Sequence, residues 1–275
     1  MGLRAWAKSD LGRDALSRLS IAAVRSAVAL RSADLIVVAG HLYSYNRIPS
    51  TSGWHRHLAD LPGIHRALGF PTNSDLEATL EASWLRLPST FAPGWLAWSN
   101  RASGLELGGS APDFKLYVSP AVEALERVFP ELVRVSTFSR ARSFKVGADG
   151  AGLLRPDKLV AYFSCLGDLA EAAHELGRRL DGVPAHGVPF TAEILGDGLL
   201  SWGVDPCLSA ETPGNRTPSW REWICHRLAE AIISASQENS GSKPAWQRAL
   251  DRLQADGIRV DRWLPSPAYW GIPTW

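Results

Sequence analysis

The feature that most constrains the fold is a run of short alternating segments within residues 112–164. Residues 114–119 alternate apolar and polar side chains with a period of two, and residues 143–147 repeat the arrangement in shorter form. This period predicts β-strands with one apolar side and one polar side. The polar side of the two predicted strands carries Lys115, Tyr117, Ser119 and Lys145.

A third predicted strand, residues 159–163, follows a turn that contains Arg155. If the three strands lie in one sheet, the cations of Lys115, Lys145 and Arg155 meet the phenol of Tyr117 on one face. Cations gathered beside a phenol indicate an anion site, most simply one for phosphate. The alternative is a solvated outer face, because half-exposed antiparallel sheets normally alternate in this way. The spacing alone leaves both interpretations open.

The composition describes an ordinary folded protein. The chain has 275 residues, of which 45% are apolar and 21% are charged, and its formal net charge is +1. This balance gives no reason to expect binding to nucleic acid or to a membrane surface. No signal peptide and no apolar run long enough to span a membrane is visible, so we expect a soluble, cytoplasmic protein.

The cysteine and histidine spacings do not indicate a metal site. The chain has three cysteines, Cys165, Cys207 and Cys225, at wide separations and without a CxxC pair. Such isolated thiols are typical of a reducing cytoplasm. The HxH pair of His55 and His57 lacks further ligands nearby. No GxGxxG, P-loop or GxSxG motif occurs, and we expect neither a metal nor an organic cofactor.

The order of predicted elements places the protein in the α+β class. Helical spacing predicts helices over residues 9–31 and from residue 73, and the Gly- and Ser-rich residues 100–111 predict an internal boundary. We therefore expect an N-terminal helical, peptide-binding region at 1–105 and a second domain at 106–275. The second domain should have a mixed or antiparallel central sheet with flanking helices.

Several local signals refine this expectation. Pro130 lies inside a helical pattern and is expected to kink or split it. Asp168 with Glu171 predicts one helix start, and Ser219 with Glu222 forms a capping box that predicts another. Further predicted elements are a strand pair at 190–195 and 199–204 across a Gly-Asp-Gly turn, a loop at 206–218, and a last helix that begins at Pro244 and ends before Gly257.

An ordered set of segments resembles a known family. The segments are FKLYVSP, SFKVG, LLRPDKLVAYF, GVPFTAEI, WGVDP, HRLAEAI and GIRVDRW. In order and spacing, from about residue 112 to residue 270, they are similar to the HopA-type type III effector family. That family includes stand-alone phosphoserine and phosphothreonine lyases of lanthipeptide and thioamitide biosynthesis. The resemblance implies a phosphothreonine-lyase-like core preceded by a helical N-terminal region.

The resemblance also implies roles for particular residues. Lys145 corresponds to the general base that takes the α-proton of a phosphorylated residue. Tyr117 stands where the eliminating enzymes have a histidine as general acid, and Ile224 and His226 stand where family arginines are expected. The implied phosphate- or substrate-binding residues are Lys115, Arg142, Arg155 and Lys158. A lysine among cations loses its proton more readily, as a base at Lys145 requires.

The function expected from the resemblance is that of a carbon–oxygen lyase. It would eliminate phosphate from phosphoserine or phosphothreonine in a precursor peptide and leave dehydroalanine or dehydrobutyrine. Its partners would be the phosphorylated peptide and a separate serine/threonine kinase, with neither nucleic acid nor a membrane involved. The departure at Tyr117 keeps a second hypothesis open, a non-catalytic module that binds a peptide or a host protein.

Overall fold

The computed structural model describes residues 14–70, 74–103, 113–206, 218–238 and 243–266. Contacts between Cα atoms divide the chain into two compact units. The first unit comprises Met1–Asn46, Pro189–Gly196 and Gly203–Trp275, and the second comprises Arg47–Val188 and Asp197–Trp202. The predicted boundary between residues 105 and 106 lies outside the described residues and stays a prediction, and the two units divide the chain elsewhere.

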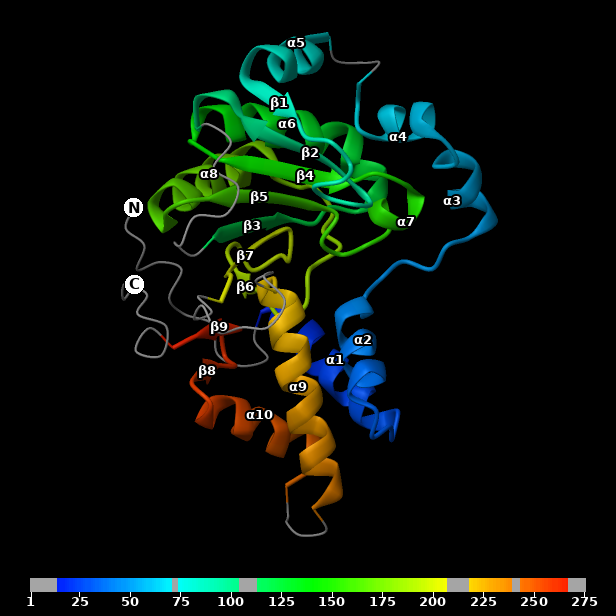
Figure 1. The fold of residues 1–275 in the computed structure, drawn as a ribbon, viewed down its shortest axis with the longest axis vertical. Coiled ribbons are helices and arrows are strands. Elements are labelled where there is room, and N and C mark those ends of the chain that lie inside the picture. The colour runs from blue at the N-terminus through cyan, green and yellow to red at the C-terminus, as the bar shows by residue number, and fades with distance from the viewer. Residues whose placement is uncertain (1–13, 71–73, 104–112, 207–217, 239–242, 267–275) are drawn as a thin grey trace. The chain divides into compact units, whose positions relative to one another are not determined.

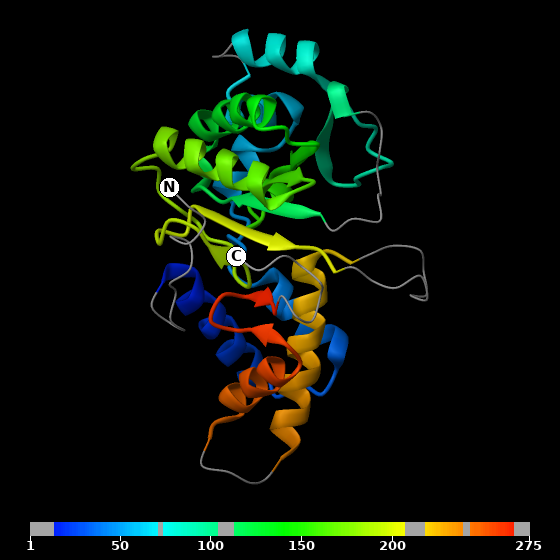
Figure 2. The ribbon, with the colours of Figure 1, turned by 90° about the vertical axis from the view of Figure 1, so that its left-hand side faces the viewer.

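Helix α9 (Trp220–Gln237) forms the centre of the first unit. The unit's other elements are α1 (Ala15–Ala29), α2 (Leu35–Ser44), α10 (Ala245–Ala255), β6 (Ala192–Glu193), β8 (Ile258–Arg259) and β9 (Leu264–Pro265). Helices α1, α2 and α10 each pack against α9 (Figure 2). Trp220, Ile224 and Leu228 of α9 are buried in the resulting hydrophobic core. This core holds the three helices on one central helix.

The second unit contains a sheet with helices packed around it. Its helices are α3 (Ser52–His57), α4 (Leu61–Ala67), α5 (Ser74–Ser83), α6 (Leu125–Phe138), α7 (Gly150–Leu153) and α8 (Leu166–Arg179), with 3-10 turns at Arg101–Ser103 and Val122–Ala124. Its strands are β1 (Trp84–Arg86), β2 (Trp95–Asn100), β3 (Phe114–Val118), β4 (Ser143–Gly147) and β5 (Leu159–Phe163). Strand β7 (Leu200–Val204) begins in this unit.

The strand order is β1-β2-β4-β5-β3-β7-β6 (Figure 1). The pairs β1–β2, β2–β4, β4–β5 and β3–β5 are antiparallel. The architecture is therefore α+β, with an antiparallel sheet, flanking helices and a helical N-terminal region, as the order of elements predicted. In the part of the chain that the structure describes, no helix is long and apolar enough to cross a membrane.

One face of this sheet is an aromatic core under α6 and α8. Phe144 of β4 is completely buried. Its ring centre lies 4.6 Å from that of Trp84, 5.1 Å from Trp98 and 6.2 Å from Phe129 of α6. Aromatic pairs at these separations stabilise a core beyond the area they bury. We name this side of the sheet the apolar face.

Several predicted helix boundaries are confirmed. Helix α1 lies within the predicted helix at residues 9–31, whose first residues are outside the described part. The Ser219 hydroxyl accepts a hydrogen bond from the Glu222 amide (3.3 Å) and caps α9. Helix α10 follows Pro244 and ends before Gly257, which has the left-handed φ of 81°.

The strand pair near residue 197 is also confirmed in shorter form. Strands β6 and β7 are neighbours in the sheet order, and the two glycines of the turn between them, Gly196 and Gly198, have φ values of 88° and 87°. Only residues 206 and 218 of the loop predicted at 206–218 fall in the described part.

Two predicted helix features differ from the structure. Of the kink or split predicted at Pro130, the split is wrong: α6 is continuous from Leu125 to Phe138, because burial of its apolar side outweighs one missing backbone hydrogen bond. The kink stays a prediction. Helix α8 begins before Asp168, at Leu166, because the Cys165 sulfur caps it by accepting from the Asp168 amide (3.5 Å).

Candidate functional site

The face of the sheet opposite the apolar face carries the predicted cations. In the register, Lys115 of β3 lies opposite Tyr162 of β5, and Tyr117 lies opposite Val160. Val160 in turn lies opposite Lys145 of β4. Directly opposite residues point to the same side of a sheet. Lys115, Tyr117, Tyr162 and Lys145 therefore share one face, as the alternation predicted, and we name it the lysine face.

Two aromatic rings connect the cations of this face. The Lys115 Nζ lies 5.1 Å from the centre of the Tyr162 ring, and the Lys145 Nζ lies 5.5 Å from the same centre. Lys145 is also 4.2 Å from the ring centre of Trp95 in β2, and the guanidinium carbon of Arg155 is 4.9 Å from it. Attraction between cations and ring faces holds the three positive groups in one row.

A close backbone contact positions Arg155. A Cβ added to Gly147 at the end of β4 would lie 2.4 Å from the carbonyl carbon of Gly152 in α7. Only the absence of side chains at both glycines lets α7 approach β4 so closely. Arg155 follows α7 and therefore lies beside Trp95. Its guanidinium also forms a two-pronged ion pair with Asp157, at 2.8 and 2.9 Å.

The predicted acid, Tyr117, lies in apolar surroundings on the lysine face. It is 3% exposed and packs against Val160 and Val188. Lys115 is likewise buried, with 5% of its surface exposed, while Lys145 is half-buried. The face therefore places a more accessible lysine beside a buried lysine and a buried phenol.

The other two predicted phosphate ligands lie in different surroundings. Arg142 precedes β4 and forms an ion pair with Asp113, just before β3. Lys158, another residue that the resemblance implies as a phosphate or substrate ligand, has no exposed surface. Its Nζ donates to the Pro120 carbonyl (2.9 Å) and lies 2.7 Å from the His186 Nδ1.

Burial lowers the pKa of Lys158 to about 7, although the negative charges of Asp157 and Glu123 act in the opposite direction. Desolvation disfavours the charged ammonium, and here it outweighs the two carboxylates. Lys158 can therefore exchange its proton near neutral pH, which an exposed lysine does not do.

The expected departures from the family arginines lie on α9, in the first unit. Ile224 is buried in the core of that unit and His226 is exposed. Arg221 is buried as well; it donates to the Tyr43 carbonyl (2.9 Å) and lies over the Tyr43 ring. Within the first unit, these contacts give Arg221 a structural role.

Three residues of the site were not predicted. Tyr162 lies in a strand of apolar and aromatic residues, Leu159–Phe163, which lacks the apolar and polar alternation that marked Lys145. Trp95 lies in β2, where the register places it on the same side of the sheet as Lys145. His186 follows α8 in an irregular segment and gives no periodic signal. Only the tertiary structure brings its ring to Lys158.

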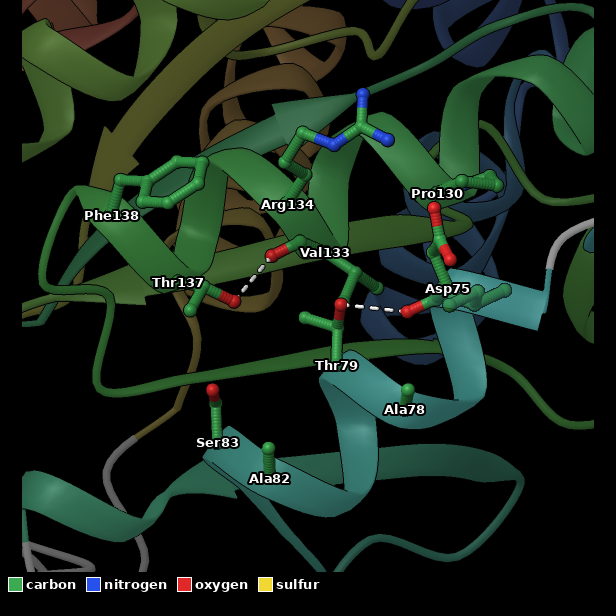
Figure 3. Close-up of a pocket in the computed structure, with 11 residues that line it drawn as sticks. Asp75, Ala78, Thr79, Ala82, Ser83, Pro130, Val133, Arg134, Thr137 and Phe138 are labelled. Carbon is green, nitrogen blue, oxygen red and sulfur yellow. Dashed lines mark hydrogen bonds between the residues drawn. The ribbon is translucent and has the colours of Figure 1, made fainter.

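A separate hollow of about 540 Å³ lies between α5 and α6 (Figure 3). Its two threonine hydroxyls are used within their own helices: Thr79 donates to the Asp75 carbonyl (2.7 Å) and Thr137 to the Val133 carbonyl (2.8 Å). The hollow has no row of cations. Across the described part of the chain, no group of three or more His, Cys, Asp or Glu side chains is arranged to hold a metal ion.

No protein-family model matches the sequence, and no curated protein matches it significantly. Solved structures do match. One is the effector protein from Pseudomonas syringae pv. tomato strain DC3000, with a TM-score of 0.51, 13% identity, and coverage of 93% of this chain and 98% of that one. This chain shares the fold of that effector. An effector protein from P. syringae pv. syringae strain 61 aligns with a TM-score of 0.48 at 13% identity, covering 90% and 98% of the two chains. The shared fold agrees with the sequence resemblance to an effector family. It does not test enzymatic activity.

Proposed function

We propose that this protein is a phosphopeptide lyase that removes phosphate from phosphoserine or phosphothreonine by β-elimination. The product would be dehydroalanine or dehydrobutyrine in a precursor peptide phosphorylated by a separate kinase. The observation that carries the proposal is the convergence of Lys115 and Lys145, whose ammonium groups lie 5.1 and 5.5 Å from the centre of the Tyr162 ring. The sequence resemblance supports it independently.

The proposed roles follow from the positions of the groups on the lysine face. Elimination needs a base at the α-carbon and cations where charge accumulates on the leaving phosphate. Lys145, the more accessible lysine, is the proposed base. Lys115 and Arg155, which flank it along the row of rings, are the proposed phosphate ligands. Tyr117 contributes little to proton delivery in this scheme, because it is buried against Val160 and Val188.

The second candidate is a recognition module that binds a phosphorylated peptide without turning it over. The observation that favours it is the buried Tyr117 at the position of the usual histidine acid. The fold shared with an effector protein is compatible with either function. Both candidates use the same row of cations, so only turnover separates them.

The test is mass spectrometry of a library of synthetic peptides that contain phosphoserine or phosphothreonine. Wild type should convert members of the library to the dehydro products with loss of phosphoric acid. Lys145→Ala should abolish the conversion and keep peptide affinity within a few fold, because a base acts on the transition state. Tyr117→Phe should reduce turnover less than Lys145→Ala does. Wild type that binds phosphopeptides without eliminating phosphate would identify the recognition module instead.

A further inference from the structure

A buried lysine–imidazole pair lies at one end of the lysine face. Lys158 directly precedes β5, and the alternation along that strand places it on the same side as Val160 and Tyr162. Its ammonium is within 2.7 Å of the His186 Nδ1 and within 2.9 Å of the Pro120 carbonyl. The proposed base and phosphate ligands do not use this pair.

Ser119 fixes the segment that carries His186. The Ser119 carbonyl accepts from the His186 amide (2.8 Å), and its hydroxyl accepts from the Gly187 amide (3.1 Å) while donating to the Pro156 carbonyl (2.6 Å). Val188, two residues further on, packs against Tyr117 and Val160. The half-buried His186 is therefore held at the end of β3 and β5, two residues before Val188, which packs against Tyr117.

The chemistry of the pair fixes the imidazole tautomer. An ammonium has donors only, so the His186 Nδ1 accepts a hydrogen bond while Lys158 is charged, and the ring proton is on Nε2. When Lys158 is neutral, its amine can accept from Nδ1–H, and Nε2 then carries no proton. The pair thus has two states that differ by one proton, and they exchange near neutral pH because burial lowers the pKa of Lys158 to about 7. Asp157 and Glu123 are the carboxylates whose charges act on Lys158, and Arg155 is paired with Asp157.

We propose that His186, supplied with protons by Lys158, is the general acid for the departing phosphate. The inference rests on the proposed lyase function and deepens it. It explains how a chain with tyrosine at the usual acid position can still protonate its leaving group. His186 is the catalytic residue in this scheme, and Lys158 is a positioning residue that acts through it.

The proton transfers balance as follows. Lys145 takes the α-proton, the electron pair of the Cα–H bond forms the Cα–Cβ double bond, and the Cβ–O bond breaks with its pair left on the phosphate oxygen. The Nε2 proton of His186 passes to that oxygen while Nδ1 takes a proton from the Lys158 ammonium. Lys158 ends neutral; after the product leaves, the pair regains a proton from water and Lys145 returns the α-proton to water.

The decisive variant is His186→Asn. Its amide oxygen can still accept from Lys158, but the side chain cannot relay a proton. With a phosphoserine peptide that wild type converts, elimination in single turnover should fall about 100-fold, the lower end of what a general acid supplies. An S-phosphocysteine peptide of the same sequence should lose much less, because its thiophosphate leaving group needs less protonation. His174→Asn, an exposed histidine of α8, is the matched control and should behave like wild type.

The pH profile gives a readout that a structural role would not change. Wild-type elimination should decline as pH rises above about 7, where Lys158 loses its proton, and His186→Asn should lack this decline. NMR of the histidine ring nitrogens, with the His186 signals assigned from the variant, should find the Nε2–H tautomer below that pH.

The outcomes separate the two proposals. Wild type that eliminates from neither peptide overturns the lyase function and the relay with it. Active wild type with an unaffected His186→Asn overturns only the relay, as does an equal loss on both peptides. An Nδ1–H tautomer while Lys158 is charged also overturns the relay, whatever the activity. Loss confined to the phosphoserine peptide, with the expected tautomer, supports it.

Discussion

The apolar face and the lysine face alternate along the same strands of the second unit, yet they are built differently. On the apolar face, the Phe144 ring is surrounded by aromatic rings and is completely buried. On the lysine face, the next residue, Lys145, keeps part of its surface and contacts the rings of Trp95 and Tyr162. Of these two adjacent residues, Phe144 packs in the core on one side of the sheet and Lys145 supplies positive charge on the other.

The difference shows where this unit can carry chemistry. On the apolar face, close-packed aromatic rings stabilise the sheet. The lysine face holds three cations that contact aromatic rings, and one of them, Arg155, is also paired with Asp157. Cations gathered at such distances favour an anion. Substitutions on the two faces should therefore separate stability from function.

The largest effect on stability is expected from the apolar face. Phe144→Ala should lower the free energy of unfolding by about 3–5 kcal/mol, because it opens a cavity among Trp84, Trp98 and Phe129. Lys145→Ala, its neighbour on the other face, should change stability by about 1 kcal/mol or less. Urea denaturation followed by tryptophan fluorescence measures both. Similar losses in the two variants would contradict the division between the faces.

A second effect concerns Lys158, the buried lysine at one end of the lysine face. The pKa of Lys158 is lowered to about 7 from 10.5, so between these values the unfolded chain binds a proton that the folded chain does not. Stability should therefore rise with pH from about 7 to 10. Lys158→Met should remove this rise, on the order of 2–5 kcal/mol. Urea midpoints of both proteins across this pH range measure the difference, and parallel curves would show that burial does not shift the group.

A third effect is on ligand binding. Lys115→Ala should weaken binding of a phosphoserine peptide by about 10- to 150-fold, since a charge-assisted contact to phosphate contributes about 1.5–3 kcal/mol. The unphosphorylated peptide should bind both proteins equally. Titration calorimetry measures the affinity. Both proteins carry Lys145→Ala in this experiment, so that the peptide is not turned over. Equal weakening for both peptides would show that Lys115 has a structural role and does not bind the phosphate.

The smallest effect concerns the close approach that positions Arg155. Gly147→Ala should destabilise the protein by about 1–3 kcal/mol, because its Cβ would meet the backbone of Gly152. Gly167→Ala is the matched control, since its Cβ would meet only the Cys165 sulfur at 3.9 Å. Thermal unfolding compares the two. A tolerated Gly147→Ala would show that α7 can move away from β4 without cost.

The sequence by itself determined which side chains share a face. Alternation placed Lys115 and Tyr117 on one side of their strand and Lys145 on the polar side of its own, because the two-residue period of a strand is a local property of the backbone. The same is true of helix starts: the capping signal at Ser219 was sufficient, whereas the one at Asp168 failed because the preceding Cys165 caps the helix instead.

Only the tertiary structure decided which of these groups meet. The order of β4, β5 and β3 places Tyr162 between two lysines, and that order depends on contacts between residues far apart in the chain. The burial of Lys158 and its contact with His186 depend on a segment that returns to β3 after α8. The periodicity of a segment does not predict such a contact, because the hydrogen bonds between the returning segment and β3 form only once distant parts of the chain have packed.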